Sequence, residues 1–141
     1  MAVCASPRFL TIVLAVGTGL LGACGLQVAS PDLFVLQRTG AGQRLRLLVN
    51  DGGTIRCDGG HPQALPGRLL IDARQLASDL DKDARAHLSL RSPPDSVYRY
   101  TMTLENGTIA FPDTAGRGHP ELARVQLFAV QAAQQACRGT G

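Results

Sequence analysis

Few side chains in this chain of 141 residues stand at spacings that support catalysis or metal binding. No two of His61, His87 and His119 lie four residues apart, and none follows a cysteine at Cys-x-x-His spacing. No serine lies in a Gly-x-Ser-x-Gly sequence, and the aspartates and glycines form neither a calcium loop nor a phosphate-binding loop. The sequence therefore predicts no catalytic residue, no metal site and no cofactor, so the thiols are the reactive groups that remain to be explained.

The first of these thiols, Cys24, follows an apolar run. Residues 9–21 form a stretch of 13 residues after the single cation Arg8. This length suits the hydrophobic part of an export signal and falls short of the ~20 residues that span a bilayer. The run ends in Leu21-Gly22-Ala23-Cys24, which resembles the lipobox of bacterial lipoproteins. The resemblance implies that the Cys24 thiol receives a diacylglyceryl group and that the chain is cleaved before it.

This resemblance also predicts how the chain is divided and where it resides. Residues 1–23 would be a lipoprotein signal peptide, residues 24–31 a lipidated tether and residues 32–141 a single domain. Acyl chains on Cys24 would anchor the domain to the cell membrane, facing outside the cytoplasm. The alternatives are an ordinary signal peptide with an incidental cysteine, or a buried hydrophobic helix.

The remaining thiols predict a cross-link. If Cys4 leaves with the signal and Cys24 carries lipid, Cys57 and Cys137 remain in a compartment where disulfides persist. An even remainder favours a bridge, and neither cysteine has a second ligand at Cys-x-x-Cys or Cys-x-x-His spacing. We therefore expect a disulfide that ties the first hairpin to the C-terminal helix. Two separate buried thiols are the alternative.

Alternating side chains between residues 33 and 57 predict a strand followed by a hairpin. Residues 33–37 form the strand, and the glycines within residues 38–42 end it. The hairpin joins residues 44–49 to residues 54–57 through a three-residue loop in which Gly53 is left-handed. This register leaves four arginines for the opposite face, as a basic outer stripe: Arg38, Arg44, Arg46 and Arg56. Such a stripe is typical of a solvated face that protects a sheet edge, or alternatively of a surface for an acidic partner.

A second hairpin is predicted by the clearest alternation in the chain, in residues 98–105. Asn106-Gly107 follows, and this dipeptide tolerates the positive φ angles of a type I′ turn. A two-residue turn there sets Leu104 opposite Ile109. We interpret the glycosylation sequon that begins at Asn106 as turn chemistry only.

Helical spacing of apolar residues predicts two helices. Asp72 is an N-cap candidate, with Gln75 three residues later as in a capping box, and residues 69–71 before it form a short additional strand. Pro120 suits the first position of the second helix, which extends to Cys137. The buried stripe of the first helix would comprise Ala73, Leu76, Ala77, Leu80 and Ala84.

Together these elements predict an α+β fold. An antiparallel sheet built from two hairpins plus an N-terminal strand would pack against two helices. Hydrophobic residues make up 45% of the chain, which is enough to bury a core. A net charge of +3, an aromatic content of 4% and the absence of tryptophan argue against nucleic acid as a partner.

Two further resemblances concern longer parts of the chain. Thirteen arginines against one lysine, with abundant alanine and glycine, are typical of GC-rich bacteria, and the chain looks like a small actinobacterial lipoprotein. Arg38-Thr39-Gly40 after a strand, the hairpin of residues 98–107 and Pro120-Glu121-Leu122 resemble the emfourin family of bacterial metalloprotease inhibitors. The lipobox and the cysteine pair depart from that family, and no inhibitory residue is carried over.

Three functions follow as hypotheses. The leading one is a membrane-anchored lipoprotein that acts as a non-catalytic binding domain for a protein partner. In the specific form of this hypothesis the partner is a protease. The second is an envelope enzyme with a dispersed site such as Asp113, Arg117 and His119, which a deep pocket gathering these side chains would favour. The third is a carrier of a small apolar ligand, which requires an apolar cavity between sheet and helices.

Overall fold

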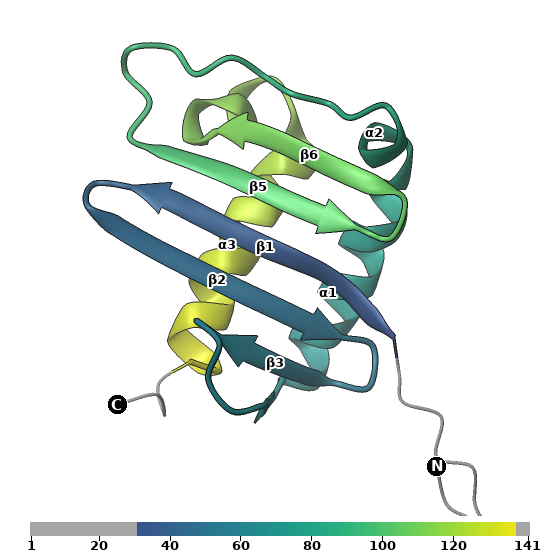
Figure 1. The fold of residues 1–141 in the computed structure, drawn as a ribbon. Helices are drawn as coiled ribbons and strands as arrows, with labels where there is room; N and C mark the ends of the chain where they lie inside the picture. The colour runs from purple at the N-terminus through teal and green to yellow at the C-terminus, as the bar shows by residue number, and fades with distance from the viewer. Residues whose placement is uncertain (1–30, 138–141) are drawn as a thin grey trace, which may run out of the picture.

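Six strands form one antiparallel sheet in the computed structural model, which describes residues 31–137 (Figure 1). Their order across the sheet is β4-β3-β2-β1-β5-β6. The strands are β1 (Asp32–Gly40), β2 (Gln43–Asn50), β3 (Thr54–Cys57), β4 (Gln63–Ala64), β5 (Tyr98–Leu104) and β6 (Gly107–Pro112). The N-terminal strand β1 therefore lies in the middle of the sheet, between the two predicted hairpins.

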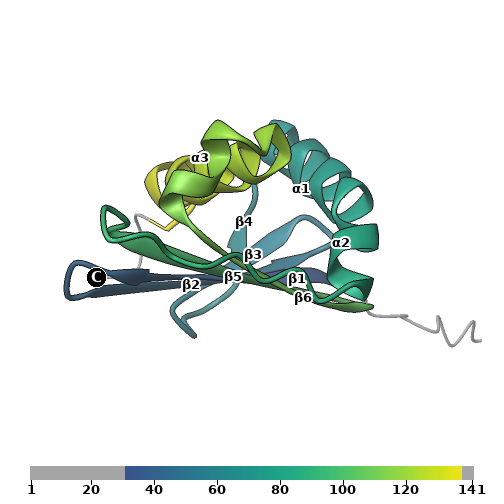
Figure 2. The same ribbon diagram turned by 90° about the horizontal axis from the view of Figure 1, so that it is seen from above.

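Helices cover one face of this sheet and leave the other without a helix in the described part of the chain (Figure 2). They are α1 (Gly67–Asp79), α2 (Asp81–Arg85) and α3 (Pro120–Gln135). A 3-10 segment, η1 (Asp113–Arg117), leads from β6 into α3. The two-layer arrangement confirms the predicted α+β class.

The core lies between the sheet and the helices. It is filled by fully buried side chains such as Leu36, Phe111 and Leu76, and each contributes roughly 1.5–3 kcal/mol by leaving water. Phe128 of the C-terminal helix is 2% exposed and packs edge-on against Phe34 with ring centroids 5.6 Å apart. No polar or charged side chain is buried within residues 31–137. Apolar burial therefore accounts for the packing of the two layers.

The first predicted hairpin is confirmed in its register. Leu47 lies opposite Cys57 and Val49 lies opposite Ile55. Gly53 closes the loop with a φ of +87°, in the left-handed region that glycine adopts without steric cost. The three-residue loop therefore decides which side chains of β2 and β3 face the helices.

The predicted break at residues 38–42 is wrong. β1 continues to Gly40, and a two-residue turn of Ala41 and Gly42, both with positive φ, leads directly into β2. Gly40 is needed here because a Cβ at this position would lie 2.1 Å from the carbonyl oxygen of Val97. Pairing of β1 with both β2 and β5 keeps residues 38–40 extended, whereas the glycines had predicted that the strand ends before them.

The second hairpin differs from its prediction by a slip of two residues. Leu104 lies opposite Gly107 instead of Ile109, and Glu105 and Asn106 form a turn without positive φ. A slip of two preserves the apolar face because side chains alternate with a period of two, so the alternation could not distinguish the registers. Contacts with α2 favour the observed one, since Asn106 Nδ2 donates a hydrogen bond to Asp81 Oδ1 at 2.7 Å.

The first helix begins earlier than predicted. Residues 69–71 belong to α1 and not to a strand, Pro66 is the N-cap, and Asp72 lies within the helix without a capping role. Leu69 is buried one turn before Ala73 and so extends the apolar stripe backwards. The helix also breaks at Leu80 before α2, which ends at Arg85. The additional strand predicted at residues 69–71 is therefore wrong, and a short strand, β4, lies before the helix at Gln63–Ala64.

Several predictions fall on residues outside the described range. These are the signal peptide of residues 1–23, the lipidated Cys24 and nearly all of the tether.

Pro120 is confirmed as the first residue of α3, with Glu121 in the first turn. Between residues 31 and 137, no helix combines the length and apolar character needed to cross a membrane.

Candidate binding face

Alternate residues of the strands form the sheet face that points away from the helices, and we call the part of it on β1, β2, β3 and β5 the open face. Neighbouring residues in each strand, such as Leu36 and Leu47, face the core. Figure 1 looks onto the open face, with the helices behind the sheet. Its side chains are Val35, Gln37, Thr39, Arg44, Arg46, Leu48, Arg56, Arg99, Thr101 and Thr103. The composition combines arginine, threonine and aliphatic residues, with no carboxylate among them.

Strand pairing arranges these side chains in three cross-strand rows. Each row carries arginine on β2 or β3, and threonine lies on β1 or β5. The rows are Arg56-Leu48-Val35-Thr103, Arg46-Gln37-Thr101 and Arg44-Thr39-Arg99. Positive charge is therefore concentrated on the β2–β3 side of the face, next to the aliphatic pair Leu48 and Val35.

Three of these arginines, Arg44, Arg46 and Arg56, form what we call the arginine cluster. Their side chains have no ion-pair partner among residues 31–137, whereas Arg74 and Arg124 elsewhere are paired with Asp51 and Asp79. Arg44 and Arg46 are two residues apart on β2, which places them about 7 Å apart along the strand. The cluster therefore presents guanidinium groups that the described fold leaves available to an external anion.

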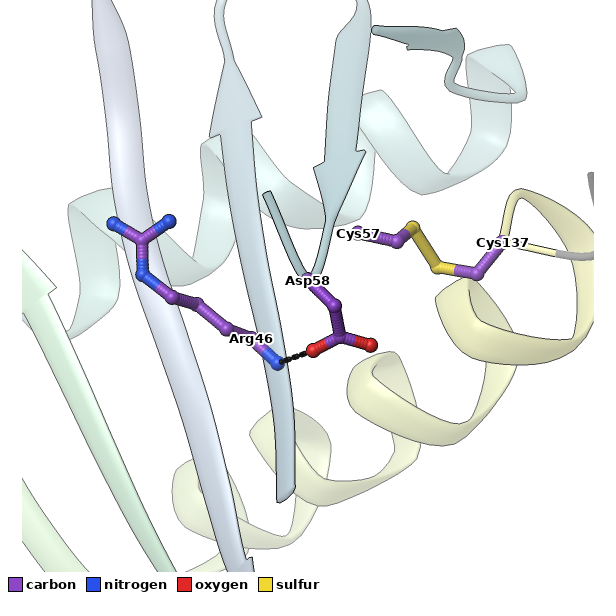
Figure 3. Close-up of a disulfide and its surroundings, with 4 residues drawn as sticks. All are labelled: Arg46, Cys57, Asp58 and Cys137. Atoms are coloured by element: carbon purple, nitrogen blue, oxygen red, sulfur yellow. Dashed lines mark hydrogen bonds between the residues drawn. A yellow bond between two sulfur atoms is a disulfide. The ribbon is translucent and has the colours of Figure 1, made fainter. Parts of the chain in front are cut away.

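One carboxylate, that of Asp58, lies at the edge of the cluster. Its Oδ1 accepts a hydrogen bond from the backbone N–H of Arg46 at 2.7 Å. The guanidinium of Arg46 points away from Asp58 and extends over β1 (Figure 3). Asp58 thus holds the backbone at the end of β3 and leaves the Arg46 side chain free of an ion pair.

The predicted basic stripe is corrected at two positions. Arg38 points to the helix side, and its guanidinium lies 5.0 Å from the centroid of the Tyr98 ring in a cation–π contact. The reason is that β1 does not break, so Arg38 keeps the alternation of Phe34 and Leu36. Arg99 joins the open face instead, which the alternation in residues 98–105 had already indicated. Its guanidinium donates to the Leu90 carbonyl at 3.0 Å.

The disulfide of the structure connects the sheet to the C-terminal helix. Cys57 and Cys137 are joined across 80 positions of sequence, with their Cα atoms 5.8 Å apart (Figure 3). The pairing agrees with the one predicted. Cys57 is 1% exposed and ends β3, the strand that carries Arg56. The cross-link therefore attaches one strand of the open face to the chain that follows α3.

Two of the three residues named for a dispersed enzyme site, Asp113 and His119, have contacts that hold local structure. The carboxylate of Asp113 accepts hydrogen bonds from Ser96 Oγ at 2.8 Å and Tyr98 N at 3.1 Å. Desolvation acts to raise the pKa of Asp113, but these hydrogen bonds outweigh it and lower the pKa below its usual value. His119 Nδ1 lies 3.3 Å from Glu121 Oε1. Asp113 thus anchors the loop before β5, and His119 accompanies the start of α3.

Two hollows lie away from the open face. A groove of about 190 Å³ runs between α1 and α3, where Arg124 pairs with Asp79 at 2.7 Å. A larger hollow of about 650 Å³ lies where β1 begins, and its lining includes Asp51 and Asp81. The hydrogen bond from Asn106, followed by the charge of Arg85, lowers the pKa of Asp81. In the part of the chain that the structure describes, no three histidine, cysteine or acidic side chains come together to hold a metal.

Comparison of the chain with protein-family models, curated proteins and solved structures found no match. The residues of the chain itself are therefore the basis for its proposed function. The most distinctive feature of residues 31–137 is the open face, where arginines without an ion-pair partner in this range border an aliphatic pair on a sheet backed by a disulfide-linked core.

Proposed function

We propose that the chain is a lipoprotein of the bacterial cell envelope whose folded domain binds a protein partner without catalysing a reaction. Acyl chains on Cys24 would anchor it to the membrane. The observation that carries the binding role is the open face, because one side of the sheet is fully packed and the other presents, beside Leu48 and Val35, arginines that form no ion pair within the described part of the chain.

The composition of the open face supports a protein partner. Arginine is enriched at protein interfaces, because its planar group binds carboxylates in two places and its stem covers apolar surface. Lysine and glutamate, which interfaces disfavour, are missing from the side chains of this face. A partly aliphatic surface that carries arginines is thus more typical of a site that binds a folded or extended polypeptide than of a surface that contacts only solvent.

The packing of the interior favours binding over carriage. A carried apolar ligand would need space between the two layers, where the buried side chains of Phe111, Leu36 and Met102 lie. Catalysis by dispersed loop residues would need a free carboxylate, whereas that of Asp113 is engaged by Ser96 and Tyr98. These contacts support a domain that acts through its surface.

The tether places this surface near the membrane. Six residues separate Cys24 from Pro31, the first described residue, and even a fully extended chain spans no more than about 25 Å between these two positions. A partner of the open face would therefore be an envelope protein, or a segment of one, within reach of the membrane surface.

The anchor is tested by mass spectrometry of the membrane fraction. We expect an N-terminal peptide that begins at Cys24 and carries acyl chains, because the thiol is the group that accepts the diacylglycerol. The variant Cys24→Ser should lack acyl chains, whereas the control Cys4→Ser should be acylated as before. A mature protein that begins elsewhere and carries no lipid would refute the anchor.

The binding face is tested by photo-crosslinking in intact cells that express the full chain. A photoreactive amino acid at Thr103, on the open face, should give an adduct with an envelope protein. The matched control is Ile71 on the helix layer, which is 67% exposed and should give none. An adduct formed from position 71 and not from position 103 would place the partner on the helices and contradict the proposal.

A further inference from the structure

The outward side chains of β2 follow a directional pattern. Arg44, Arg46 and Leu48 occupy alternate positions of the strand, so two positive charges are followed by an aliphatic residue. On the neighbouring strand, Thr39 and Gln37 lie beside the arginines and Val35 lies beside Leu48. The outward series on β2 thus ends in an aliphatic contact formed by two side chains, Leu48 and Val35. The first two positions of the series are charged.

The spacing of this pattern matches that of an extended polypeptide. Alternate residues of a strand are about 7 Å apart, and the same distance separates alternate side chains in any extended segment. A segment lying along β2 can therefore place two carboxylates at Arg44 and Arg46 in one register. The residue two positions further along then reaches Leu48 and Val35.

The charge of the arginine cluster determines which charge a ligand of the open face must carry. The arginine cluster has no ion-pair partner among residues 31–137, and Asp58 at its edge is bound to a backbone N–H. Two carboxylates elsewhere in the domain already pair with arginines outside the cluster, Asp79 with Arg124 and Asp51 with Arg74. Guanidinium groups form their strongest hydrogen bonds with carboxylates or phosphates, so the complement of this face is an anion.

The aliphatic pair distinguishes an acidic polypeptide from an anionic lipid surface. Lipid headgroups present negative charge without a fixed spacing and offer no apolar group at a set distance from it. Val35 and Leu48 lie between Arg56 and Thr103 in one row, which suits an apolar side chain in line with two acidic ones.

Building on the proposed function, we propose that the partner contributes an extended acidic segment to the open face. Two carboxylates at alternate positions pair with Arg44 and Arg46, and an apolar residue two positions beyond contacts Leu48 and Val35. The recognised pattern is acidic-x-acidic-x-apolar along the direction of β2, where x is any residue.

The test uses the full mature chain in detergent and synthetic peptides as probes. The first peptide is Thr-Glu-Thr-Glu-Thr-Leu-Thr, and the control is Thr-Glu-Glu-Thr-Thr-Leu-Thr, which has the same composition and charge out of register. Isothermal titration calorimetry should show binding of the first peptide that is about tenfold tighter than that of the second. The double variant Arg44→Glu/Arg46→Glu should lose this binding, whereas Arg68→Glu/Lys82→Glu, with both positions exposed on helices α1 and α2, should retain it.

Flotation of the Cys24→Ser chain, which lacks acyl chains, with phosphatidylcholine vesicles that contain or lack phosphatidylglycerol tests whether the open face binds anionic lipid instead. Equal affinity for both peptides, or no binding to either, would overturn the inference. Binding to anionic vesicles that Arg44→Glu/Arg46→Glu abolishes, without preference between peptides, would identify a lipid surface as the ligand instead. If the crosslink from Thr103 still captures a protein when the peptides fail, the proposed function stands and only the acidic segment is refuted.

Discussion

Replacement of both Cys57 and Cys137 by serine is expected to lower the free energy of unfolding by about 4 kcal/mol. The disulfide closes a loop across 80 positions of sequence, so its removal restores a large conformational entropy to the unfolded chain. For a domain of this size the loss corresponds to a fall in Tm of roughly 20 °C. Urea unfolding of the mature chain, followed by circular dichroism, measures the change.

The reference for this experiment is the mature chain with Cys24→Ser, so that lipid does not affect the comparison. The single variants Cys57→Ser and Cys137→Ser should lose as much stability as the double variant, because either one breaks the bond. Equal stability of the reference and the double variant would contradict the prediction, as would alkylation of both thiols in the unreduced reference. Two separate thiols would then replace the bridge.

A consequence for function follows from the position of the bridge. β3 pairs with the very short β4 on its outer side, so the disulfide is a major restraint on the end of the strand that carries Arg56. Loss of the bridge would therefore loosen one row of the open face, whereas Arg44 and Arg46 on β2 remain held between β1 and β3.

Substitution Gly107→Ala is expected to destabilise the domain by roughly 3 kcal/mol. The added Cβ would lie 2.1 Å from the carbonyl oxygen of Ala84 and 2.7 Å from its carbonyl carbon. Both are backbone atoms, so either α2 or the β5–β6 turn has to move. That movement would also disturb the hydrogen bond between Asn106 and Asp81. Thermal and urea unfolding measure the loss.

The control for this substitution is Gly118→Ala, where the built Cβ has no neighbour within 4 Å and φ is negative. Its effect should stay within about 0.5 kcal/mol. An unchanged stability of Gly107→Ala would contradict the observed register. Cross-strand NMR contacts would then decide directly, since the structure pairs Met102 with Ile109 and the type I′ turn predicted from the sequence pairs Met102 with Phe111.

The amino-acid sequence by itself determined those features that depend on neighbouring residues. The register of β2 and β3 followed from a short loop ending in Gly53, because only one loop length keeps Cys57 inside and Arg56 outside. The start of α3 followed from Pro120, which suits the first helical position for local reasons. The pairing of Cys57 with Cys137 followed from counting thiols and not from geometry.

Tertiary structure determined those features for which the local sequence pattern fits two alternative structures equally well. A slip of two residues in the second hairpin keeps every side chain on its face, so only contacts of the turn with α2 select the pairing of Leu104 with Gly107. Residues 69–71 have the composition of a strand, and burial of Leu69 beside Ala73 makes them helical.

The candidate site shows the same division. Alternation assigned Arg44, Arg46 and Arg56 to one face of the hairpin, but it could not show that the face stays uncovered. It also placed Arg38 with them, because the continuation of β1 depends on pairing with β5, about sixty residues away in the chain. Which face the helices cover is a property of long-range packing, and this packing leaves the arginines exposed on the open face.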